Sequence, residues 1–300
     1  MGLLNKIFNK KPVLEQNLDE KDKVVPGMIF TIQLLFEEPC EMPDKDFMTS
    51  VMEKHLGEAE YYSYDEKMAG FSANKYLAEF SDAKVPPLLS VMGCDEFDGS
   101  KIGVLERSNM WNCKNSEELL ESCKYQVFAT DMMAAALHYK ERAELDMDFL
   151  EALVEMFPTC KAVYFQNCGK LFEADAIRNH DYPRDERFIY FAVNVRFFNI
   201  QGTEDMVVDS LGMSTLFLPD VQYHFHGMDQ NLVVDHAYNV LCYIYDNECP
   251  IESGECIDGI VDGKLSQEVM WKCQYEQALI QPVREVLDIC MNEYAAGGRE

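Results

Sequence analysis

Short apolar runs with strand periodicity alternate along this chain with amphipathic helical stretches, and this rhythm limits the fold more than any other feature. The run MIFTIQLLF (28–36) is rich in β-branched and aromatic residues, which predicts a buried strand. A helix is expected after Pro43, with Asp44 as its cap. Further strands are predicted at 59–64, 75–80, 86–92 and 125–130, and a helix at 116–123. The mixture predicts an α+β fold with mainly antiparallel sheets.

A second stretch with a helix followed by a strand, 146–166, aligns with 44–64 at an offset of 102 residues. Five of the twenty-one aligned positions are identical. This similarity favours two ferredoxin-like or α/β-sandwich parts. Any two amphipathic helix–strand segments resemble each other to some extent, so duplication and chance similarity both stay open.

Changes in composition divide the chain into three segments. Residues 1–27 combine a small basic amphipathic stretch with a charged linker, which predicts a flexible tail and, as the less favoured alternative, weak contact with a membrane surface. Residues 28–183 are expected to form an N-terminal α+β part. Residues 184–300 are expected to form a C-terminal α+β domain that opens with a continuous strand at 188–200.

Acidic side chains outnumber basic ones about two to one. Fifty-three Asp and Glu against twenty-six Lys and Arg give a formal net charge of −27, which disfavours nucleic acid as a partner. The favoured explanation of this charge is solubility, and the alternative is complementarity to a basic protein partner. The eleven cysteines form no CxxC pair, as expected of reduced thiols in a cytoplasmic protein. No apolar run reaches the roughly 18 residues of a transmembrane helix.

Three of the six histidines lie close together, at positions 224, 226 and 236. The stretch VQYHFH (221–226) predicts a strand, whose period of two would place His224 and His226 on one face. Tyr223 and its apolar neighbours would occupy the other face. His236 falls on a predicted helix at 231–247, with Asp229 as its cap.

Two imidazoles two residues apart on a strand can bind one transition metal such as zinc, with Asp220 or His236 as a further ligand. His236 can approach the pair only if its helix covers the polar face of the strand. The alternative is a hydrogen-bonded or solvent-exposed histidine pair. No other cofactor is expected, because the sequence contains no Walker A, GxGxxG or GxSxG motif.

The stretch DSLGMSTLFLPDVQYHFHGMDQ and the later PVREVLDI resemble the bacterial domain-of-unknown-function family 4261. The resemblance rests on the LG, LPD, HF and GMD elements, followed by a glycine-bearing hairpin, and covers about residues 206–290. It implies a bacterial cytosolic protein. The family has no assigned activity, so no catalytic residue can be carried over.

The charge and the lack of a complete catalytic motif together favour a non-enzymatic protein-binding module of the immunity or stress-adaptor kind, with an acidic surface. Two alternatives remain. One is a metal-dependent hydrolase that uses the pair His224 and His226. The other is a regulatory module in which these histidines sense pH.

Overall fold

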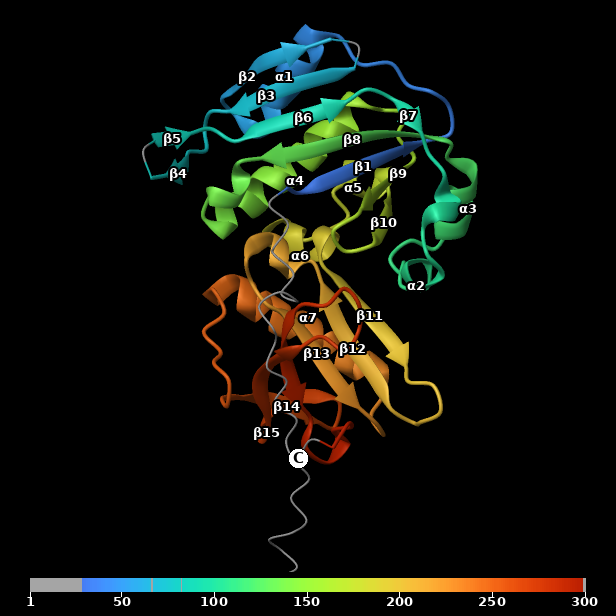
Figure 1. Ribbon diagram of the computed structural model, residues 1–300, viewed down its shortest axis with the longest axis vertical. Coiled ribbons are helices and arrows are strands. Elements are labelled where there is room, and N and C mark those ends of the chain that lie inside the picture. Colours follow the sequence, from blue (N-terminus) through green and yellow to red (C-terminus); the bar gives the residue numbers. More distant parts are fainter. Residues whose placement is uncertain (1–28, 66, 82, 299–300) are drawn as a thin grey trace, which may run out of the picture. The chain divides into compact units, whose positions relative to one another are not determined.

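The computed structural model describes residues 29–65, 67–81 and 83–298, so the predicted tail and linker lie outside the described residues. The described chain forms two units (Figure 1). The N-terminal unit holds residues 29–194 together with Gly212–Phe217, and the C-terminal unit holds 195–211 and 218–298. The stretch 184–194, assigned above to the C-terminal domain, thus falls in the N-terminal unit. Each unit combines helices with a mainly antiparallel sheet, which confirms the predicted α+β class.

An eight-stranded sheet forms the centre of the N-terminal unit, in the order β10-β9-β1-β8-β6-β3-β2, with the short β7 paired to β8. Its pairings are antiparallel. The strands are β1 (Thr31–Phe36), β2 (Ala59–Tyr64), β3 (Met68–Ala73), β6 (Leu88–Met92), β7 (Asp95–Glu96), β8 (Tyr125–Met132), β9 (Ala162–Phe165) and β10 (Lys170–Glu173). The strands β4 (Ala78–Phe80) and β5 (Ala83–Val85) form a separate hairpin.

Two helices, α1 (Lys45–Leu56) and α4 (Tyr139–Met156), connect β1 to β2 and β8 to β9. Asp44 caps α1 as predicted, because its side chain accepts from the backbone N–H groups of Asp46 and Phe47. In each connection other strands lie between the two that are joined, which is the split β-α-β pattern of ferredoxin-like folds, widened here by β3 and β6. The similar segments 44–64 and 146–166 therefore occupy equivalent places in a single sheet.

A buried ion pair holds α4 to β8. Arg142 donates to the Asp131 carboxylate, at 3.0 Å from Nε, and to the backbone oxygen of Thr215 at 2.6 Å. Asp146, one turn further along α4, lies 3.9 Å from Arg142 Nε, and neither of its carboxyl oxygens has a hydrogen-bond partner. Burial, and next the Asp131 carboxylate, raise the pKa of Asp146 well above its ordinary value.

The excursion between β6 and β8 packs on the sheet and forms its own apolar cluster. It contains β7, a short 3₁₀ turn, α2 (Val104–Arg107) and α3 (Ser116–Ser122), the last of which the sequence predicted. Buried side chains from β1, β9 and β10 meet those of the excursion: Leu35, Phe97, Met110, Cys113, Leu120, Cys123, Ala162, Tyr164 and Leu171. The short α5 (Ala174–Arg178) follows β10.

The predicted strand over 188–200 is wrong in its first half. Residues Arg187–Ala192 form helix α6, and strand β11 begins only at Asn194 and runs to Asn199. A short apolar run fits a buried helix as well as a strand, and tertiary packing decides between them. Here Arg187 donates to Asp148 and Glu151 of α4 at 2.8 and 2.6 Å, while Phe191 packs among aromatic rings that include Phe172.

A six-stranded sheet in the order β11-β12-β13-β16-β15-β14 forms the C-terminal unit. Its further strands are β12 (Met206–Leu211), β13 (Asp220–Phe225), β14 (Cys256–Val261), β15 (Lys264–Gln277) and β16 (Glu285–Cys290). β13 and β16 are parallel, whereas the pairs β12–β13, β14–β15 and β15–β16 are antiparallel.

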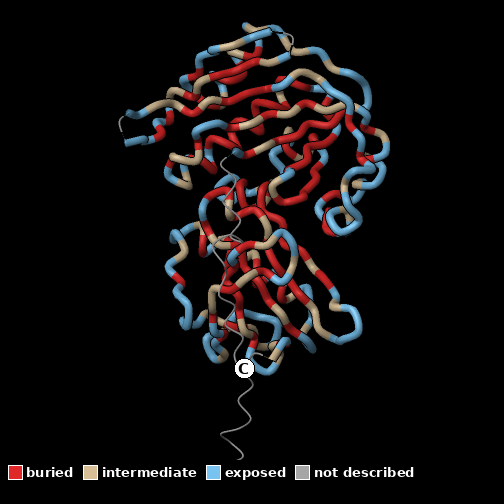
Figure 2. The backbone as a smooth tube through the Cα atoms, viewed as in Figure 1, coloured by how far each residue is buried: buried red, intermediate tan, exposed pale blue. Residues whose placement is uncertain are grey.

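One long helix, α7 (Gln230–Asn247), packs on this sheet with Asp229 as its cap, as the sequence predicted. Figure 2 shows buried backbone concentrated along the strands and exposed backbone in the connections of both units. None of the helices in the described part of the chain is both long and apolar enough to cross a bilayer.

Candidate functional site

Strand β13 presents two chemically different faces, and α7 covers the apolar one. The Tyr223 hydroxyl lies 2.8 Å from His236 Nδ1 on α7. Gln222, on the opposite face, donates to Asp288 of β16 at 3.0 Å. Because successive side chains of a strand alternate between faces, His224 lies on the side opposite to His236, whereas His226 follows the end of β13. The structure therefore places His236 across the sheet from His224.

His236 is buried among aromatic residues, with both ring nitrogens hydrogen-bonded. Nε2 lies 2.8 Å from the backbone oxygen of Asp258, which can only accept, so Nε2 carries the proton and the Tyr223 hydroxyl donates to Nδ1. The ring of Trp271 lies 4.7 Å away between centroids. Burial lowers the pKa of His236, which favours this neutral form.

The other two histidines have different surroundings. His224 is half buried, with Nε2 3.6 Å from a carboxylate oxygen of Asp205, and its backbone oxygen accepts from Ala296 at 2.9 Å. His226 is exposed, and its backbone N–H donates to Tyr294 at 2.8 Å. The segment after β16 thus lies along this end of β13, and the two rings occupy unlike environments.

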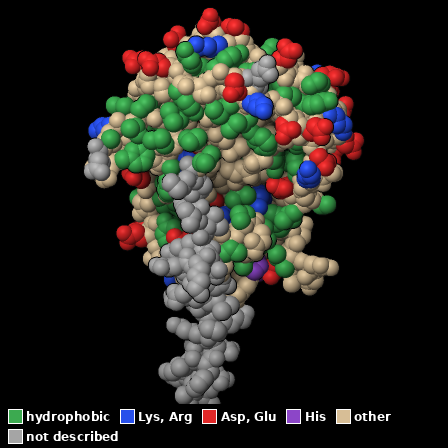
Figure 3. Space-filling model, turned by 45° about the horizontal axis from the view of Figure 1, so that its top comes forward, with side chains coloured by type: hydrophobic (Ala, Val, Ile, Leu, Met, Phe, Trp, Pro, Cys, Tyr) green, Lys and Arg blue, Asp and Glu red, His purple; other side chains and the backbone are tan. Residues whose placement is uncertain are grey.

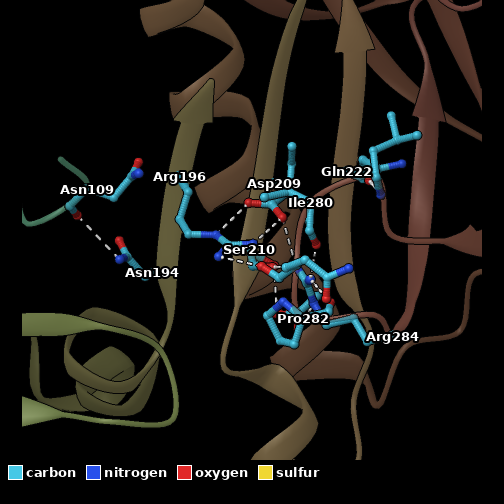
Figure 4. Close-up of polar contacts among 12 residues, drawn as sticks. Asn109, Asn194, Arg196, Asp209, Ser210, Gln222, Ile280, Pro282 and Arg284 are labelled. Atoms are coloured by element: carbon cyan, nitrogen blue, oxygen red, sulfur yellow. Dashed lines mark hydrogen bonds and ion pairs between the residues drawn. The ribbon is translucent and has the colours of Figure 1, made fainter. Parts of the chain in front are cut away.

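Asp220 belongs to a buried ionic cluster. Its carboxylate accepts from Ser210 at 2.8 Å and from Arg284 at 3.1 Å. Arg284 also donates to Asp209 at 2.8 Å, and Arg196 forms a bidentate pair with Asp209 at 2.9 and 2.6 Å (Figure 4). Arg196 and Arg284 thus both pair with buried carboxylates.

The same arginines hold the segment that precedes β16. Arg284 donates to the backbone oxygens of Ile280 and Pro282 at 3.1 and 2.9 Å, and Arg196 donates to that of Gln281 at 3.0 Å (Figure 4). Paired charges with their hydrogen-bonding groups satisfied are the usual way in which a protein tolerates buried carboxylates. We therefore assign the cluster a structural role.

The four predicted metal ligands, Asp220, His224, His226 and His236, are not brought together. Asp220 is bound by Arg284, and His236 lies across the sheet from His224. Throughout the described ranges, no group of three His, Cys, Asp or Glu side chains is placed to hold a metal ion. His224 lies on β13, whereas His226 follows the end of this strand, so the predicted common strand face does not extend over both histidines.

A groove runs between α7, the connection after it and β14, with a volume of about 740 Å³. His236 is one of its lining residues. The others combine apolar side chains with two carboxylates: Asn239, Val240, Tyr243, Pro250, Ile251, Glu255, Cys256, Ile257, Asp258 and Leu265. We call this feature the α7–β14 groove, and its shape and mixed chemistry make it the candidate functional site.

β14 is the edge strand of its sheet, so backbone groups on its outer side have no neighbouring strand within the described part of the chain to pair with. One of them, the Asp258 oxygen, is the acceptor of His236. Beyond it the pairing with β15 shifts at Gly259, where a Cβ would stand 2.8 Å from Trp271 Nε1. Gly259 therefore allows the close approach of the ring that supports His236.

Sequence reasoning identified His236 as a candidate residue but not the groove. The wall formed by Glu255, Asp258 and Leu265 lies on a hairpin whose position against α7 depends on contacts distant in sequence. In the structure His236 belongs to the buried face of α7, with Val233, Ala237 and Val240 at helical spacing.

No curated protein and no solved structure matches the chain significantly. Residues 209–290 match a family model and include Asp209, Asp220 and Arg284 of the ionic cluster and every lining residue of the α7–β14 groove, whereas Arg196 lies outside the match. The resemblance predicted from the LPD, HF and GMD elements is confirmed: residues 209–290 match the model of the family described as domain of unknown function DUF4261.

Proposed function

We propose that this protein is a binding module, and that its α7–β14 groove holds an extended segment of a basic protein partner. The observation that carries the proposal is the combination of an apolar floor, carboxylates at the wall and an edge strand in one groove. A module of this kind acts as an adaptor or an immunity protein does, by holding another protein.

The apolar part of the groove suits one or two anchoring side chains. Val240 and Ile251 are buried, whereas Tyr243 and Leu265 are 48% and 52% exposed. Covering such side chains gains roughly 25 cal/mol for each Å² of apolar surface removed from water. Tyrosine is also among the residues that most often contribute strongly to protein interfaces.

The negative charge of the groove favours a partner segment with positive charge. Glu255 and Asp258 line it, and neither Lys nor Arg occurs among its described lining residues. The net charge of the chain, −27, adds a long-range attraction for basic segments. On the face of the molecule shown in Figure 3, acidic side chains are scattered near the edge of the view among hydrophobic side chains and several basic ones.

The edge position of β14 supports an extended rather than a helical ligand. A peptide that lies along an open strand gains main-chain hydrogen bonds, and its alternate side chains point into the neighbouring groove. His236 already occupies the Asp258 oxygen. We therefore expect main-chain pairing at the Cys256 end of β14, with the side chains of the ligand in contact with α7.

Selection of a random displayed peptide library on the full-length protein tests the proposal. We expect enrichment of peptides that place an apolar residue next to Lys or Arg, with affinities that fall as salt is raised. Leu265→Arg and Glu255→Lys should each weaken the selected peptides about tenfold or more, which corresponds to about 1.4 kcal/mol.

Matched controls change the same residue types outside the groove. Leu279 is 42% exposed, and Glu268 is an exposed residue of β15. Leu279→Arg and Glu268→Lys should leave the affinities of the selected peptides unchanged. The proposal fails if no peptide is enriched, or if the groove variants bind the enriched peptides as well as the controls do.

A further inference from the structure

Two cysteines that are distant in sequence are in contact in the N-terminal unit. Cys40 lies in the connection from β1 to α1, and Cys94 lies between β6 and β7. The backbone N–H of Cys40 donates to the Cys94 sulfur at 3.3 Å, which places the two cysteines side by side. Neither forms a disulfide in the described chain.

The accessibility of this pair distinguishes it from most of the other thiols in the unit. Cys40 and Cys94 are both half buried, whereas Cys113, Cys123 and Cys160 are buried. A reagent in solution can therefore reach Cys40 and Cys94 while the buried thiols stay protected. Close approach of two cysteines together with partial exposure is what a reversible disulfide requires.

We propose that Cys40 and Cys94 are a redox modification site, which forms an intramolecular disulfide by exchange with a low-molecular-weight disulfide such as glutathione disulfide. The Cys94 thiolate attacks one glutathione sulfur, which forms a mixed disulfide and releases one glutathione thiolate. The Cys40 sulfur, after losing its proton to water, then attacks the Cys94 sulfur and releases the second glutathione thiolate. Two protein thiols are oxidised, and one glutathione disulfide is reduced to two glutathione molecules.

The order of attack follows from the surroundings of the two sulfurs. Burial, and next the hydrogen bond with Cys94, raise the pKa of the Cys40 thiol to about 12, so Cys40 is a poor first nucleophile. The backbone N–H of Cys40 already points at the Cys94 sulfur and would donate to a thiolate there. In the second step Cys40 is held against its target, and this proximity offsets its low fraction of thiolate.

The bond would fasten two segments that form walls of cavities in this unit. Glu37, Glu38 and Pro39, directly before Cys40, line a cavity of about 740 Å³. Glu96 and Phe97, shortly after Cys94, line another of about 370 Å³. Oxidation would thus restrict the movement of both walls at once.

The test is treatment of the reduced full-length protein with glutathione disulfide, followed by acid quenching, proteolysis and mass spectrometry. We expect a peptide in which Cys40 is linked to Cys94, an intact mass lowered by two hydrogen atoms at this pair, and reversal by dithiothreitol. In Cys40→Ser, glutathione should remain attached to Cys94. In Cys94→Ser, Cys40 should stay unmodified.

Cys256 is exposed, so its modification by glutathione reports within the same sample that the reagent is active. The proposal is overturned if Cys256 is modified while Cys40 and Cys94 both stay reduced. It is equally overturned if Cys94 carries glutathione in the wild-type protein without linking to Cys40.

Discussion

Replacement of Asp146 by Asn should change how the stability of the N-terminal unit depends on pH. The Asp146 carboxyl is fully buried and without a hydrogen-bond partner, because Arg142 donates to Asp131 and Thr215 instead. Burial first, and then the Asp131 carboxylate, raise its pKa well above the ordinary 3.8. The folded protein therefore retains a proton on this group that the unfolded chain has already released.

The sign of the effect follows from this difference. The contribution of the protonated Asp146 carboxyl to the free energy of unfolding is fully present below about pH 3.8, the ordinary pKa. It is lost as the pH rises through the pKa of this group in the folded state. Within that window stability falls by about 1.4 kcal/mol for each pH unit. Asn is neutral at every pH, so Asp146→Asn removes the slope. Its amide adds donors without a partner, at a cost of about 1–3 kcal/mol that does not depend on pH.

Urea unfolding at a series of pH values measures the slope. The chain has two tryptophans, so a Trp271→Phe background leaves Trp111 to report on the N-terminal unit. We expect Asp146→Asn to gain stability relative to the parent as the pH rises, whereas Asp185→Asn, a change at an exposed position, should follow the parent. Parallel curves for Asp146→Asn and its parent would refute the assignment of a protonated buried carboxyl.

Three further predictions concern the C-terminal unit. Arg284→Met removes one partner from a buried ionic cluster and should cost about 3–5 kcal/mol in urea unfolding, and a loss below about 1 kcal/mol would contradict its burial. Because burial lowers the pKa of His236, an NMR titration of its ring should give a midpoint below the ordinary 6.5, and a midpoint at or above that value would contradict the buried neutral form. Gly259→Ala would place a Cβ 2.8 Å from Trp271 Nε1, so it should lower the free energy of unfolding by about 1–3 kcal/mol and change the tryptophan fluorescence. An unchanged spectrum and stability would show that this contact is not tight.

The sequence by itself determined the elements whose signals are local. The strand β1, the caps Asp44 and Asp229, and the sorting of β13 into an apolar and a polar face all follow from periodicity and capping chemistry within a few residues. The α+β class follows from the same local patterns, whereas the DUF4261 match at 209–290 was predicted from the resemblance of the LPD, HF and GMD elements. These features need no knowledge of distant contacts, because the backbone and its nearest side chains already favour one conformation.

Only the tertiary structure decided which surfaces meet. The apolar run at 188–192 was predicted as the beginning of a strand, but it forms helix α6, whose Arg187 pairs with Asp148 and Glu151 of α4. Asp220 could have been a metal ligand until Arg284, 64 residues away, was seen to bind it. The face of β13 that α7 covers was likewise open, and it places His236 in the α7–β14 groove and away from His224. The free energy of burying apolar surface comes from contacts between elements that are far apart in the chain, so local sequence patterns do not predict which surfaces will meet.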